Sequence, residues 1–256
     1  MELLSGAEEW LGMAMEIKQM NRVAASIGFF WITMGAASYG SETLVVRYSK
    51  FTPREKTNWV NLIISFVHAV IVCSLSMYVV VSPDGTMEED RVYGSSDMAN
   101  LICAIAAGYF FFDMGACLTG EKVDPLMVFH HLASFLCYTF VQYQFLAYYA
   151  VRLLLYELST PLLDIREMML LLGYRNTPQL AKVEKAFGIV FLAARILYGI
   201  PLSIGALYDV MNVWWSSNSV HSDFIVVYFI VANVGLNTLN IMWLTKMIRK
   251  KQTKTE

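Results

Sequence analysis

The chain has 256 residues, of which 57% are hydrophobic and only 16% are charged, and its mean hydropathy is +0.49. Soluble domains contain roughly 45–50% apolar and about 25% charged residues, so this composition excludes an ordinary soluble protein. The formal net charge is only −2 and no basic arm lies outside the apolar segments, which leaves a nucleic-acid partner without support. We therefore expect an integral membrane protein.

Six or seven apolar stretches follow one another along the chain, most of them bounded by charged residues, proline or glycine. A helix needs about 20 apolar residues to cross a bilayer, and the fourth stretch is near the short limit. Only Gln142 to Gln144 separate the fourth stretch from the fifth, so this pair forms either a tight hairpin or a partly re-entrant element. We expect an all-α bundle of about seven transmembrane helices, over about 24–46, 59–81, 98–118, 126–143, 145–163, 186–208 and 224–245.

The basic residues alternate between the connecting segments, and such residues are retained on the cytosolic side. Segments 47–58 and 164–185 and the chain after residue 245 are rich in Lys and Arg, whereas the alternate segments are poor in them. We therefore predict a non-cytosolic N-terminal segment 1–22, a first transmembrane helix 23–46, a six-helix domain 59–247 and a basic cytosolic tail 248–256. Segment 164–185 mixes apolar and charged residues, which predicts either an interfacial helix or an ordinary loop.

Seven ionisable residues lie within the apolar stretches, where each costs roughly 2.5–3.5 kcal/mol. From the helical rise of about 1.5 Å per residue, six of them fall in the cytosolic half of the membrane, and Arg152 lies nearer the midplane. Such convergence predicts one polar cavity open to the cytosol, because isolated charges would lack partners. The seven residues are His68, Asp113, His130, His131, Arg152, Glu157 and Arg195.

Three stretches carry polar residues at i, i+4 and i+7, which places each set on one helix face. From these sets, and from the position of Arg195 within an apolar stretch, we expect four residues to contact a lipid or substrate. They are Asn61, His68, Arg195 and Asn237. The alternative is that the sets only form hydrogen bonds between helices. The sets are Asn61, Ser65 and His68; His130, Ser134 and Cys137; and Asn233, Asn237 and Asn240.

The adjacent His130 and His131 form the most specific local pattern. Neighbouring residues on a helix point about 100° apart, whereas paired metal-binding histidines prefer i, i+4, so we expect no metal and no cofactor. The pattern supports two alternatives. One imidazole acts as a general base and is oriented by Asp113 or Glu157, so that these four residues are the catalytic candidates. Otherwise Asp113, Glu157, Arg152 and Arg195 form a buried ion-pair network that holds helices together.

Two further features concern local structure. Pro161 follows Glu157 by four residues and lacks a backbone N–H, so the helix either kinks or ends there. The four cysteines all lie in apolar stretches, so we expect them to be packing residues rather than disulfide partners. They are Cys73, Cys103, Cys117 and Cys137.

These residues carry a resemblance to the TLC domain family, which includes ceramide synthases and TLC domain-containing proteins linked to lipid homeostasis. It rests on Phe129 to Ser134 around the histidine pair, on Asp113 after Gly108 to Phe110, and on Glu157 to Pro161. It extends from about His68, in an Asn-X3-Ser-X2-His stretch, to the basic tail.

The resemblance implies a seven-helix lipid-binding chamber, in the endoplasmic reticulum or alternatively the plasma membrane, that takes acyl chains or sphingolipid-like molecules. Ceramide synthases carry a second motif, His-Asp with another Asp three residues on, where this chain has Tyr156 and Glu157 followed by Thr160 and Pro161. We therefore expect a protein that binds or regulates membrane lipids. The alternatives are an N-acyltransferase with acyl-CoA as its substrate, or a proton-coupled transporter; the oligomeric state stays open.

Overall fold

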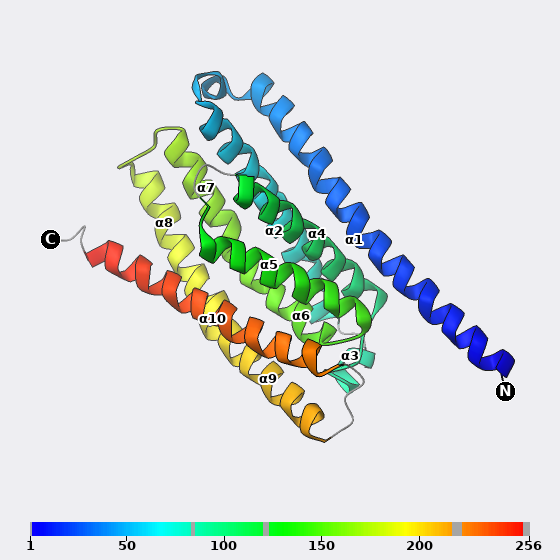
Figure 1. The fold of residues 1–256 in the computed structure, drawn as a ribbon. Coiled ribbons are helices and arrows are strands. Elements are labelled where there is room, and N and C mark those ends of the chain that lie inside the picture. The colour runs from blue at the N-terminus through cyan, green and yellow to red at the C-terminus, as the bar shows by residue number, and fades with distance from the viewer. Residues whose placement is uncertain (1, 83–84, 120–122, 217–221, 253–256) are drawn as a thin grey trace.

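The computed structural model describes residues 2–82, 85–119, 123–216 and 222–252, and every regular element within them is helical (Figure 1). Short 3₁₀ segments η1 (Val46–Lys50), η2 (Val141–Tyr143) and η3 (Leu154–Ser159) and a π-helical segment η4 (Leu192–Tyr198) join or interrupt the α-helices. The α-helices are α1 (Glu2–Leu44), α2 (Pro53–Val81), α3 (Gly85–Glu89), α4 (Asp97–Thr119), α5 (Pro125–Phe140), α6 (Ala147–Leu153), α7 (Thr160–Leu171), α8 (Pro178–Phe191), α9 (Gly199–Trp215) and α10 (Asp223–Gln252).

Within the described residues, five helical runs are long and apolar enough to cross a membrane: Ile17–Leu44, Pro53–Val81, Asp97–Thr119, Pro178–Trp215 and Asp223–Arg249. They confirm the first, second, third, sixth and seventh expected spans and make the protein an integral, multi-pass membrane protein. The fourth expected span corresponds to α5 with η2, and the fifth to the run α6–η3–α7. In Figure 1 these two runs travel in opposite directions along the bundle.

The connection between α5 and α6 is a tight reversal. Gln144 and Leu146 adopt left-handed backbone conformations, with φ of 57° and 61°. The Leu146 N–H donates to the Val92 carbonyl oxygen at 2.7 Å, so the segment before α4 holds the turn in place. The pair therefore forms the hairpin that was one of the two expected alternatives.

The segment 164–185 consists of the end of one helix, a short turn and the beginning of the next helix. Helix α7 continues to Leu171, and α8 begins at Pro178 after a short turn in which Gly173 has φ of 87°. The Thr177 hydroxyl accepts from the Leu180 N–H at 3.2 Å, and proline follows at the first helical position, which together start α8. The segment is therefore mostly helical rather than an ordinary loop, and whether its helical part lies at the membrane surface stays a prediction.

Helix α4 lies against α1, α2 and α5, and its small residues permit close contact. A Cβ atom on Gly108 would lie 2.3 Å from the Ser26 Oγ atom of α1, so only glycine fits at this crossing. Large apolar side chains such as Ile32, Leu197 and Ile204 point away from the bundle and are exposed. An outer surface of this kind suits contact with lipid tails.

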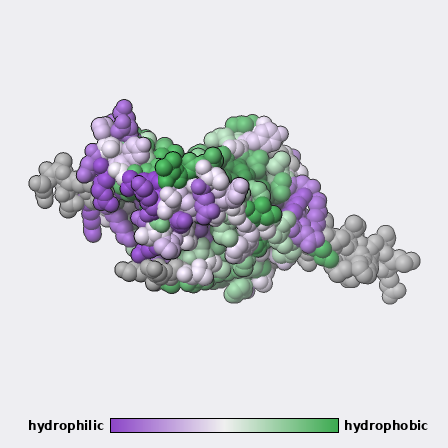
Figure 2. Space-filling model, turned by 90° about the horizontal axis from the view of Figure 1, so that it is seen from above, coloured by the Kyte–Doolittle hydropathy of each residue, from purple (hydrophilic) through white to green (hydrophobic). Residues whose placement is uncertain are grey.

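Polar groups gather at the ends of the bundle. The Arg47 guanidinium lies beside Gly173, so the α1–α2 connection and the α7–α8 turn share one end. Figure 2 views the molecule from that side and shows hydrophilic side chains gathered in purple around larger green hydrophobic areas. Toward the beginning of α1, Lys18 Nζ lies 3.2 Å from Asp97 Oδ2. The two basic segments expected on one side thus lie together, and their cytosolic orientation stays a prediction.

Candidate functional site

A cavity that is partly open to the outside lies between α5, the α6–η3 run, η4–α9 and α10. Most of its lining is aliphatic or aromatic. The polar residues that line it are His130, Ser134, Cys137, Tyr138, Tyr149, Tyr156, Glu157, Arg195, Ser203, Asn233, Asn237 and Asn240.

Arg195 and Glu157 form a buried ion pair in this lining. The Arg195 Nη2 atom lies 3.4 Å from Glu157 Oε1, and each side chain is about nine-tenths buried. The other carboxylate oxygen accepts a 2.6 Å hydrogen bond from the Thr160 hydroxyl. Arg195 Nη1 donates to Asn240 Oδ1 at 3.2 Å. Because the two charges compensate each other, this part of the cavity is polar without net charge.

The local backbone around Pro161 creates a binding position for the arginine. In a continuous α-helix the Thr160 N–H would bond to the Tyr156 carbonyl oxygen, but in η3 it bonds to the Glu157 carbonyl oxygen. That carbonyl is available because Pro161 has no N–H. The freed Tyr156 carbonyl accepts from Arg195 Nε at 3.1 Å. The proline thus changes the helix to a 3₁₀ turn rather than ending it.

Arg195 lies in the π-helical segment η4, where each N–H bonds five residues back and the helix bulges. Immediately after it, Gly199 allows close contact with η3, because a Cβ atom there would overlap the Tyr156 ring at 1.5 Å from Cε1. The bulge and the glycine together bring α9 against the residues that surround Glu157.

The histidine stripe of α5 faces the cavity, since His130, Ser134 and Cys137 all line it. His130 Nδ1 is buried and has no hydrogen-bond partner within the described part of the chain. The His130 ring meets Trp243 of α10 edge to face, with ring centroids 5.5 Å apart. An unpaired imidazole nitrogen in a cavity wall is available to a ligand.

The asparagine stripe of α10 both lines the cavity and joins helices. The Ser203 hydroxyl donates to Asn233 Oδ1 at 2.7 Å. The Tyr156 hydroxyl donates to Asn237 Oδ1 at 3.0 Å. The two expected roles of this stripe, ligand contact and interhelical hydrogen bonding, are therefore compatible.

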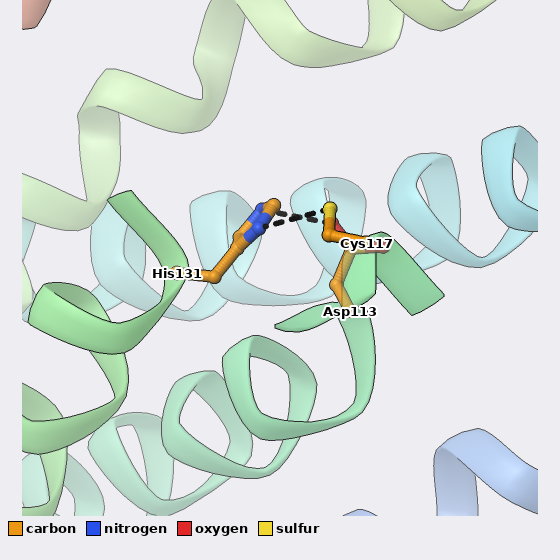
Figure 3. A group of neighbouring side chains, drawn as sticks. All are labelled: Asp113, Cys117 and His131. Atoms are coloured by element: carbon orange, nitrogen blue, oxygen red, sulfur yellow. Dashed lines mark hydrogen bonds and ion pairs between the residues drawn. The ribbon is translucent and has the colours of Figure 1, made fainter. Parts of the chain in front are cut away.

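His131 faces away from the cavity, toward α4 (Figure 3). It is 3% exposed, and its Nε2 atom lies 2.8 Å from Asp113 Oδ2. Its Nδ1 atom lies 3.5 Å from the Cys117 Sγ atom. One ligand atom from each of these three residues lies within 4.8 Å of the others. We call Asp113, Cys117 and His131 the thiol–imidazole cluster.

His68 lies behind this cluster, fully buried, with its ring stacked on Tyr109 at a centroid distance of 3.7 Å. Neither of its ring nitrogens has a hydrogen-bond partner among the residues that the structure describes. Asn61 lies half-buried two turns earlier on α2. Neither residue lines the cavity.

The structure thus divides the candidate residues into two groups. Four line the cavity: His130, Glu157, Arg195 and Asn237. The other four, Asp113, His131, His68 and Asn61, lie on the α2 and α4 side of the bundle. The expected four-residue ion-pair network is absent from the described residues, because Arg152 Nη2 contacts Glu88 of α3 at 2.5 Å while Arg195 pairs with Glu157.

Sequence reasoning missed three features of this region. Cys117 follows Asp113 by four residues, a spacing that already placed them on one face, yet it was assigned to packing. Asp164 is 3% exposed but was placed just beyond the fifth span. The third feature is the π-helical segment η4, which hydropathy does not distinguish from an ordinary α-helix.

Comparison with known proteins identifies relatives over nearly the whole chain. Residues 58–249 match the family model described as the TLC domain. The chain is 30% identical over 240 residues to TLC domain-containing protein 4-B of Danio rerio, covering 92% of this chain and 89% of that protein. It is 25% identical over 236 residues to an uncharacterized TLC domain-containing protein of Schizosaccharomyces pombe, covering 90% and 78%. It is 27% identical over 208 residues to TLC domain-containing protein 4 of Homo sapiens, covering 78% and 76%.

Proposed function

Because this chain belongs to the TLC domain family, and because its bundle contains an elongated cavity, we propose that it binds a membrane lipid there. The ligand has an apolar chain and a compact headgroup without net charge. This binding serves membrane lipid homeostasis in the endoplasmic reticulum. The role in lipid homeostasis and the location in the endoplasmic reticulum rest on the family resemblance alone, whereas the cavity supports lipid binding.

The observation that carries the proposal is a change of polarity along three cavity walls. On α10 the lining changes from Phe229 to Asn240, eleven residues or about 16 Å further along. On α5 and η2 it changes from Val141 to His130, and on η4–α9 from Val210 to Arg195. A cavity with one apolar end and one polar end fits an amphipathic molecule, whose chain and headgroup need different surroundings.

The polar end indicates the headgroup. Arg195 is compensated by Glu157, so an additional full charge on the ligand would stay unpaired in a buried site. The Asn237 and Asn240 side chains in this lining are uncharged, and the buried His130 Nδ1 atom has no hydrogen-bond partner within the described residues. Hydroxyl and amide groups, such as those of a sphingolipid-like headgroup, match this set.

A cavity-filling variant tests the proposal. Ala206 lines the cavity and is 4% exposed, so Ala206→Phe fills the space that the apolar chain would occupy. Ile204 on the same helix is 61% exposed, so Ile204→Phe adds the same side chain to the outer surface as a matched control. The proteins are purified in detergent, and their co-purified lipids are quantified by mass spectrometry.

We expect near-stoichiometric retention of one lipid class by the unmodified protein and by Ile204→Phe, and at least tenfold less by Ala206→Phe. Equal retention by all three would refute binding in this cavity. A parallel incubation with labelled acyl-CoA and a sphingoid base covers the enzymatic alternative. An N-acyl product that is lost in His130→Ala would replace lipid binding by acyl transfer as the function.

A further inference from the structure

We propose that the thiol–imidazole cluster binds one zinc ion, with Asp113, Cys117 and His131 as its protein ligands. The inference does not rest on the lipid proposal, because none of the three residues lines the cavity. It also revises the expectation of no metal, which considered only the histidine pair.

The ligand types suit zinc. Thiolate, imidazole and carboxylate are the three groups that bind Zn²⁺ in proteins, whereas Mg²⁺ and Ca²⁺ take oxygen ligands. A cluster with one sulfur and one nitrogen ligand therefore favours a borderline-soft cation over the hard ones.

The backbone brings these groups together on two rigid elements. Asp113 and Cys117 are four residues apart on α4, which places both on one face of that helix. His131 lies on α5, which packs against α4 along much of its length. Figure 3 shows the Cys117 and Asp113 side chains on the same side of the imidazole ring. Ligands fixed on packed helices lose little freedom when a metal binds.

The distances agree with a tetrahedral zinc site after a small adjustment. Zn–S and Zn–N bonds of about 2.3 and 2.05 Å at a tetrahedral angle separate sulfur and nitrogen by about 3.5 Å. The His131 Nδ1 and Cys117 Sγ atoms are 3.5 Å apart. The same geometry separates nitrogen and oxygen by about 3.3 Å. Asp113 Oδ2 contacts the other ring nitrogen, Nε2, at 2.8 Å, so the carboxylate must leave Nε2 when Nδ1 binds the metal. Since all three ligand atoms lie within 4.8 Å of one another, a movement of about 1.5 Å at most completes the set.

The surroundings support the ligands and leave a route for the ion. The Tyr109 hydroxyl lies 3.5 Å from Asp113 Oδ2, where it orients the carboxylate from outside the coordination shell. His131 is buried, whereas Asp113 and Cys117 are only half-buried, within six residues of the end of α4 at Thr119. Three protein ligands leave a fourth position of zinc for water or a substrate.

The first test needs no substitution. The purified full-length protein is treated with a thiol-alkylating reagent, with and without ZnSO4, and modification is quantified peptide by peptide. We expect zinc to slow the alkylation of Cys117 at least tenfold and to leave Cys137, which lies outside the cluster, unchanged. Equal alkylation of Cys117 in both samples would overturn the proposal.

The second test compares metal content in matched variants. Cys117→Ser removes the sulfur ligand, and Cys73→Ser makes the same change at a buried cysteine of α2 whose thiol donates to a backbone carbonyl. After zinc loading and removal of free metal, we expect about one zinc per chain in the unmodified protein and in Cys73→Ser, and almost none in Cys117→Ser.

Cobalt substitution shows directly whether a thiolate binds the metal. We expect a sulfur-to-cobalt charge-transfer band in the unmodified protein and in Cys73→Ser, and its loss in Cys117→Ser and His131→Gln. A size-exclusion profile and a melting temperature close to those of the unmodified protein show that these variants are folded. Zinc that persists equally in all variants, or an unmodified protein that takes up none, would contradict the site.

Discussion

The Arg195–Glu157 pair makes a quantitative prediction about stability. Arg195→Met preserves much of the side-chain volume but leaves the Glu157 carboxylate buried without its cation. Removing one partner of a buried ion pair costs about 3–5 kcal/mol, and Arg195 is 7% exposed, so solvent cannot replace the lost interactions. The guanidinium also donates to the Tyr156 carbonyl and to Asn240. These contacts put the expected loss in the upper part of that range.

The assay is reversible unfolding in mixed micelles, followed by tryptophan fluorescence. Lys182→Met, at an exposed position of α8, is the control and should change the free energy of unfolding by less than about 1 kcal/mol. The double variant Arg195→Met with Glu157→Gln removes the unpaired charge, so it should be more stable than Arg195→Met alone. Additive effects of the two substitutions, or an Arg195→Met loss no larger than that of the control, would refute the reasoning.

Two glycines give further predictions about packing. Gly108→Ala should destabilise the protein by about 1–3 kcal/mol in the same unfolding assay, because its Cβ would meet α1 at 2.3 Å. Gly115→Ala on the same helix has open space and should not destabilise; similar values for both would disprove the crossing geometry. Gly199→Ala should displace Tyr156 and lower lipid retention severalfold, while Gly188→Ala, also in open space, should retain lipid as the unmodified protein does. Undiminished lipid in Gly199→Ala would argue against the packing around Glu157.

Hydropathy predicted the continuous helices well because a long apolar run has few alternatives in a bilayer. It did not show that the fifth span changes to a 3₁₀ turn at Glu157 or that the sixth contains a π-helical segment at Arg195. Such changes depend on which backbone groups find partners in neighbouring helices. Pro161 gave a partial signal, since its missing N–H indicated an irregularity without its type.

For the site, periodicity predicted which residues share a helix face but not which faces meet. The stripe of His130, Ser134 and Cys137 indeed faces one cavity. The direction of His131 toward Asp113 and Cys117 depends on how α5 is rotated against α4, which depth estimates cannot supply. The expected ion-pair network included Arg152, whereas its partner Glu88 lies between the second and third expected spans.

The most direct test of the lipid-binding cavity is an experimental structure of the protein in a lipid nanodisc. We expect elongated density between α5, α9 and α10, with its wider end at Arg195 and Glu157 and its narrow end near Val210 and Phe229. A cavity closed by side chains, or one with lipid density only on the outer surface of the bundle, would contradict it.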